Sequence, residues 1–134
     1  MGTKTVNRDD FRAAARRWYR DGCHLLQDDR YPGASHAFGL AAECALKHSM
    51  ERLPGAQREL PRRHLPELLN DARLWLSGRR HRGLTQLLGW RDYMHGWQMD
   101  NRYWADDCFD AQGCRLFRDH ARRTLQAAGV EVAT

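Results

Sequence analysis

Residues 32–52 read PGASHAFGLAAECALKHSMER, and this stretch decides the fold class. Its apolar and small residues recur with the 3.6-residue period of an α-helix, and a run of small residues lets a neighbouring helix approach closely. Glu43 precedes Lys47 by four residues, which is the favourable order for an ion pair on one helix face. We predict a helix over 32–52 that carries a structural Glu43–Lys47 ion pair.

The segments on either side of this stretch predict further helices with short connections. The expected helices cover residues 8–28, 32–52, 64–77, 82–99 and 107–128. Asn7 is expected to cap the first helix and Gly129 to end the last. No segment of any length alternates with period two, so no sheet is expected. The prediction is an all-α, four- to five-helix up-and-down bundle that forms one domain over 1–134, with its core at about 8–128.

The composition is that of a globular domain. Of 134 residues, 42% are hydrophobic and 29% are charged, and no apolar run approaches the length of a membrane span. The first seven residues lack the apolar stretch of a signal peptide, so a cytoplasmic location is expected. The four cysteines form no Cys-x-x-Cys pair and are expected to be buried free thiols. They are Cys23, Cys44, Cys108 and Cys114.

The charge balance is basic and comes almost entirely from arginine. The chain has 22 Lys and Arg against 17 Asp and Glu, and a formal net charge of +5. The planar guanidinium of arginine suits phosphate recognition, so RNA or a nucleotide is one expected partner. A solvated helix face is the other interpretation of such residues, and it is the one favoured for four arginines of the first helix. These are Arg12, Arg16, Arg17 and Arg20.

Residues 29–47, DRYPGASHAFGLAAECALK, resemble the second-helix signature of the HEPN domains, the higher eukaryote and prokaryote nucleotide-binding helical domains. A His-Leu element at 64–69 and the Arg102-Tyr103 pair follow in the order that this family shows. The resemblance covers about 10–128, nearly the whole chain.

This resemblance implies two alternative functions. Many HEPN domains are metal-independent ribonucleases of toxin–antitoxin or phage-defence systems, and they use an Arg-x(4–6)-His motif in a cleft shared by two subunits. Others lack the motif and act as dimerisation modules or as non-catalytic partners of nucleotidyltransferases or other defence proteins. The expectation is therefore an RNA- or nucleotide-binding domain, either with ribonuclease activity or as a partner module.

The first candidate catalytic site combines Arg91, His95 and Arg102. Arg91 and His95 are four residues apart, so they would share one face of the predicted helix over 82–99, although Arg-x(3)-His is one residue shorter than the family motif. His95 would transfer protons and the arginines would hold phosphate. Four aromatic residues close by are expected to stack on bases. They are Trp90, Tyr93, Trp97 and Tyr103.

The alternative site is Arg115 with His120, which matches Arg-x(4)-His literally but lies in the middle of the predicted last helix. The histidines and cysteines show no metal-ligand spacing, so neither a metal nor another cofactor is expected. Trp90, Trp97 and Trp104 are too many for one narrow helix face, which predicts that some are exposed or buried in a two-fold homodimer.

Overall fold

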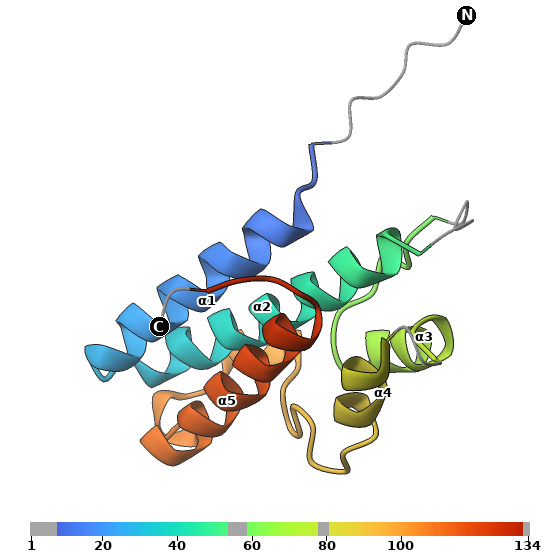
Figure 1. Ribbon diagram of the computed structural model, residues 1–134. Helices are drawn as coiled ribbons and strands as arrows, with labels where there is room; N and C mark the ends of the chain where they lie inside the picture. The colour runs from blue at the N-terminus through green and yellow to red at the C-terminus, as the bar shows by residue number, and fades with distance from the viewer. Residues whose placement is uncertain (1–7, 54–58, 78–80, 133–134) are drawn as a thin grey trace, which may run out of the picture.

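The computed structural model describes residues 8–53, 59–77 and 81–132, and within these ranges it is all-helical with no strand. The α-helices are α1 (Phe11–Gln27), α2 (Tyr31–Glu51), α3 (Leu68–Trp75), α4 (Arg82–Leu88) and α5 (Ala111–Ala127) (Figure 1). Two short 3-10 helices, η2 (Met99–Tyr103) and η3 (Asp106–Cys108), lie between α4 and α5. The predicted all-α fold is confirmed.

Helix α2 is the centre of the molecule. It packs against α1, α3, α5 and η2, and every residue from 41 to 50 is buried. Helices α1 and α2 run antiparallel, α5 lies along both, and the short α3 and α4 sit together to one side (Figure 1). Since both α1 and α5 rest on α2, the surface between α1 and α5 has α2 behind it.

The helix ends follow local capping. Helix α1 begins at Phe11, three residues later than predicted, because the side chain of Asp10 accepts a hydrogen bond from the Ala13 N–H at 2.9 Å. Asn7, the predicted cap, lies outside the described residues. Gly129 ends α5 as predicted, with φ +74° and a hydrogen bond from the Val130 N–H to the Leu125 carbonyl at 2.8 Å.

The predicted helix over 82–99 is wrong beyond Leu88. Gly89 follows α4, and the chain then makes tight turns in which Met94 and Gly96 have positive φ values of 47° and 83°. Tertiary contacts account for this course, because Tyr93 and Trp97 are both pulled into the core. The Tyr93 hydroxyl bonds to that of Thr124 at 2.7 Å, and the Trp97 indole N–H donates to the Ser35 carbonyl at 2.9 Å.

Glu43 on α2 carries a buried carboxylate that three donors satisfy. Lys47 Nζ lies 3.4 Å away, which confirms the predicted ion pair. His64 Nδ1 donates at 3.0 Å and the Leu65 backbone N–H at 3.0 Å. These contacts, here called the Glu43 network, hold residues 64–65 against α2. The third helix accordingly begins at Leu68 rather than at the predicted His64.

The cysteines are free thiols, as predicted. Cys44 and Cys114 are buried and Cys23 is partly buried, whereas Cys108 is exposed, so the expectation of burial is wrong for Cys108. None of the described helices is long and apolar enough to cross a membrane.

We expect Glu43→Gln to lower the free energy of unfolding by about 3 kcal/mol, because it leaves the buried Lys47 ammonium without its counter-ion. Chemical denaturation followed by circular dichroism measures the change. The matched control is Glu67→Gln, which alters an exposed residue and should change stability by less than about 0.5 kcal/mol. Equal stabilities of the two variants would contradict the importance of the Glu43 network.

Gly39→Ala tests the packing of Trp97 on α2. A Cβ at Gly39 would lie 1.8 Å from Trp97 Cε2, so the indole or the helix must move, and we expect a loss of about 3 kcal/mol. Gly83→Ala is the control, since its Cβ would make an ordinary 3.5 Å contact with Ala127 Cβ. Thermal unfolding of both variants compares them, and a wild-type melting temperature for Gly39→Ala would show that Trp97 is not seated against α2.

Candidate functional site: a basic groove between α1 and α5

The first candidate pair, Arg91 and His95, lies on the exposed turn after α4. The two residues do not share a helix face, because α4 ends at Leu88 and the His95 N–H instead closes a turn on the Asp92 carbonyl at 3.1 Å. The geometric basis on which these two residues were paired is therefore wrong.

Arg102 is held within its own loop. Its Nη1 donates to the Met99 carbonyl at 2.9 Å, and its guanidinium lies over the Tyr103 ring, 4.4 Å from the ring centroid. Both side chains are exposed, and within the described part of the chain no hydrogen bond or ring contact joins Arg102 to Arg91 or His95. The structure does not assemble the three residues into one site.

The predicted base-stacking residues divide into two groups. Tyr93 and Trp97 are 3% and 1% exposed, so the expectation that they stack on bases is wrong for this conformation. Trp90 and Tyr103 are exposed, and the Arg123 guanidinium lies over the Trp90 ring, 5.4 Å from its centroid. Trp104 is also exposed, which confirms that some of the tryptophans remain on the surface.

His120 has a structural role. Its Nδ1 accepts a hydrogen bond from the Met94 backbone N–H at 2.9 Å, and its ring stacks on Tyr93 with centroids 5.8 Å apart. Burial lowers the pKa of His120, which favours the neutral ring that this hydrogen bond requires. Arg115 lies on another face of α5, so the second Arg–His pair is not brought together either.

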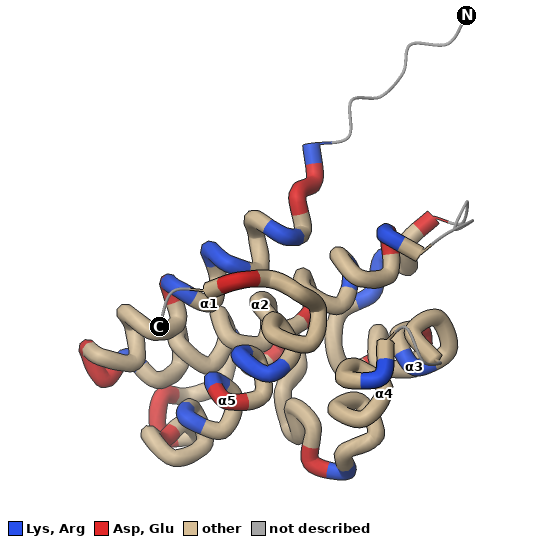
Figure 2. Tube along the Cα trace, in the orientation of Figure 1, with Lys and Arg blue, Asp and Glu red and all other residues tan. Residues whose placement is uncertain are grey.

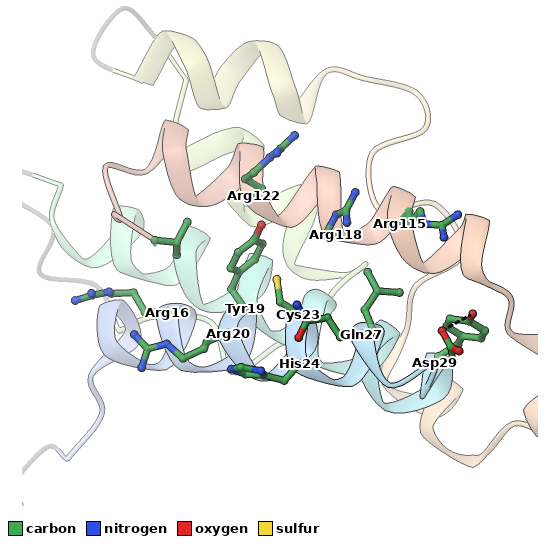
Figure 3. Close-up of a pocket in the computed structure, with 13 residues that line it drawn as sticks. Arg16, Tyr19, Arg20, Cys23, His24, Gln27, Asp29, Arg115, Arg118 and Arg122 are labelled. Atoms are coloured by element: carbon green, nitrogen blue, oxygen red, sulfur yellow. Dashed lines mark hydrogen bonds between the residues drawn. The ribbon is translucent and has the colours of Figure 1, made fainter. Parts of the chain in front are cut away.

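A groove of about 770 Å³ lies between α1 and α5, and its lining is rich in arginine. Here called the basic groove, it is lined by Arg16, Tyr19, Arg20, Cys23, His24, Leu26, Gln27, Asp29, Tyr31, Arg115, Arg118, Arg122 and Val132. Figure 2 shows basic segments along both helices, and Figure 3 shows that Arg16 and Arg20 come from α1 whereas Arg115, Arg118 and Arg122 come from α5.

Helical spacing explains both rows of side chains. On α5, Arg115, Arg118 and Arg122 are separated by three and four residues, so they share one face. On α1, Arg16 and Arg20 are four residues apart, and Tyr19 and Cys23 project from the same helix towards α5 (Figure 3). The spacing of 3.6 residues per turn thus places five arginines in the lining of one cavity.

Two neutral donors accompany the arginines. Burial raises the pKa of Tyr19 to about 12 and also raises the pKa of the Cys23 thiol. Near pH 7 both groups keep their protons, so they add hydrogen-bond donors rather than negative charge to the groove. The positive character of the cavity is preserved.

The arginines of the groove are only partly neutralised. Asp119 lies 3.5 Å from Arg118 and 3.6 Å from Arg122, in two half-buried pairs. Within the described residues, Arg16, Arg20 and Arg115 have no ion-pair partner. In addition, the Nε of Arg16 is buried without a hydrogen-bond acceptor there, which is unfavourable unless a ligand supplies one.

Sequence reasoning missed this groove. It interpreted Arg16 and Arg20 as part of a solvated face, and it considered Arg115 only as a partner for His120. The available signal was the i, i+3, i+7 spacing of arginines on the last helix, but the sequence could not show that α1 would present its own arginines opposite them. Arg12 and Arg17, the other two residues of that predicted face, do not line the groove.

The described residues contain no group of three or more His, Cys, Asp or Glu side chains placed to hold a metal ion. A scan of the chain against models of protein families finds no match, and searches of curated proteins and of solved structures find none. The resemblance to HEPN domains thus stays a prediction, and the functional argument rests on the geometry of the basic groove.

Burial of histidines predicts a loss of stability in acid. The pKa of His120 is lowered in the fold, so below about pH 6.5 the unfolded chain binds a proton that the native state does not, and stability falls as the pH falls. The melting temperature should therefore drop between pH 7 and pH 5. His120→Ala should lower the melting temperature at pH 7 and reduce its decrease between pH 7 and pH 5. Replacement of the exposed His95 by Ala should leave both quantities unchanged. An undiminished drop in His120→Ala would contradict this role.

Proposed function

We propose that the chain is a helical RNA-binding domain that holds the phosphates of a single strand in the basic groove. The observation that carries the proposal is the convergence of five arginines from two helices on one cavity. Guanidinium groups pair with phosphate oxygens through charge-assisted, bidentate hydrogen bonds, and this contact is independent of base sequence.

The dimensions of the groove support a short stretch of single strand. At 1.5 Å per residue, Arg115 and Arg122 are about 10 Å apart along α5, and the α1 wall from Arg16 to Gln27 is about 16 Å long. A cavity of about 770 Å³ falls in the size range of sites that enclose a small ligand. A positively charged groove that follows a backbone is the usual arrangement for unpaired strands.

Binding without cleavage fits the site better than ribonuclease activity does. The proton-transfer residues expected from sequence, His95 and His120, do not line the basic groove, and His120 Nδ1 is already occupied by the Met94 N–H. The partner-module alternative of the HEPN resemblance, with a homodimer and a nucleotidyltransferase or defence-protein partner in the cytoplasm, is therefore the one that we favour.

The test is the salt dependence of binding to a fluorescently labelled decamer of oligouridine, followed by anisotropy. Each phosphate neutralised on a single strand contributes about −0.7 to the slope of log K against log salt concentration, so three to five contacts predict a slope of about −2 to −3.5. The double variant Arg115→Gln/Arg118→Gln should bind more weakly and with a slope shallower by about 1.4.

The control is Arg17→Gln, which removes an exposed arginine of α1 that does not line the groove. Its slope should stay within about 0.3 of the wild type, less than the change from losing one phosphate contact. The same loss in Arg17→Gln and in the double variant would mean that net charge, rather than the groove, binds the strand. Cleavage of the oligonucleotide in EDTA by the wild type, abolished in His95→Ala, would restore the ribonuclease assignment.

A further inference from the structure

One end of the basic groove differs from the rest in charge. Asp29 is the single carboxylate among the lining residues, and it lies in the turn between α1 and α2, beside Arg115 and far from Arg16 (Figure 3). Its backbone has a positive φ of 57°, and this left-handed conformation reverses the chain between α1 and α2. A carboxylate repels phosphate, so this end suits a part of the ligand that carries hydrogen-bond donors instead.

Within the described residues, the carboxylate of Asp29 makes one side-chain hydrogen bond and keeps an oxygen for a further donor. Its Oδ1 accepts a hydrogen bond from the Tyr31 hydroxyl at 3.1 Å, a contact that also raises the pKa of Tyr31. Within the described residues, no hydrogen bond reaches the second oxygen, Oδ2. An ionised carboxylate accepts several hydrogen bonds, so Asp29 keeps capacity for a donor from a ligand.

The surroundings of Asp29 suit a nucleoside rather than a phosphate. The side chain of Leu26 and the ring of Tyr31 line the same end of the groove, where they offer apolar surface to a sugar or base. Arg115 is the arginine of the groove that lies nearest to this end in Figure 3. Starting from this end, the groove thus presents a hydrogen-bond acceptor and apolar surface first, and arginines after them.

We propose that Asp29 reads the ribose of a bound single strand by accepting a hydrogen bond from a 2′-hydroxyl, which makes it the residue that selects RNA over DNA in the basic groove. The 2′-hydroxyl is a donor that DNA lacks, and it is the group by which a protein distinguishes the two at a given position. This inference rests on the proposed function. It also defines how the strand lies in the groove, with a sugar at the Asp29 end and the phosphates along the arginines.

The experiment compares the affinities of the full chain for oligouridine and oligodeoxyuridine decamers at one salt concentration, because these ligands differ only in the 2′-hydroxyl. We expect the wild type to favour RNA by about fivefold, the effect of about one hydrogen bond. Asp29→Gly should abolish this preference by lowering the affinity for RNA towards that for DNA. Glycine suits the positive φ, so the turn is retained, which circular dichroism and the melting temperature verify.

Two further variants test whether the preference comes from the Asp29 carboxylate itself, rather than from local negative charge or from the Tyr31 hydroxyl. Asp28→Asn removes the same charge one residue earlier, at an exposed position that does not line the groove, and should keep the preference. Tyr31→Phe retains the aromatic ring and removes the hydrogen bond to Asp29 Oδ1, and this variant should also retain the preference for RNA. Loss of the preference in Asp28→Asn, or in Tyr31→Phe, would overturn the assignment to Asp29.

The remaining outcomes distinguish this inference from the proposed function. Equal, salt-dependent binding of both decamers by the wild type would overturn the role of Asp29 while leaving the groove as a phosphate site. An RNA preference that survives Asp29→Gly would overturn it as well. Absence of salt-dependent binding to either decamer would refute the proposed function and this inference together.

Discussion

The buried carboxylate of Glu43 is the interaction on which the rest of the structure depends. It lies at the centre of α2, the helix that contacts most of the others, and its donors come from α2 itself and from the connection to α3. A charge in this position is unfavourable unless it is fully paired, so the chain can bury α2 only when residues 64–65 return to it. The Glu43 network therefore fixes how the second half of the molecule closes on the first.

The basic groove is a consequence of that central position. Helices α1 and α5 both pack on α2, with Gly22 of α1 so close to Phe38 that a Cβ there would lie 2.7 Å from the ring. The two outer helices thus lie side by side, and arginines of both helices line the groove between them (Figure 3). These guanidinium groups repel one another, and a bound polyanion would relieve that repulsion.

The sequence predicted what depends on local periodicity and missed what depends on tertiary contact. The long helices α1, α2 and α5 and the Glu43–Lys47 pair follow from helical spacing within single segments. The prediction of a helix over 82–99 was wrong beyond Leu88. The apolar spacing there is helical, but Tyr93 and Trp97 hydrogen-bond to α5 and α2, and these tertiary contacts determine the course of the chain. The basic groove was missed for the same reason, since its two walls are about ninety residues apart in the chain, and only the fold of α1 and α5 on α2 joins them.

The central claim is that RNA binds between α1 and α5 and not at the turn after α4. Titration of the ¹⁵N-labelled protein with an oligouridine decamer tests it most directly, through the changes in backbone amide chemical shifts. The largest changes should fall on residues 16–29 and 115–122. Changes concentrated on residues 90–103, with the two groove helices unaffected, would contradict it and return the binding site to Arg91, His95 and Arg102.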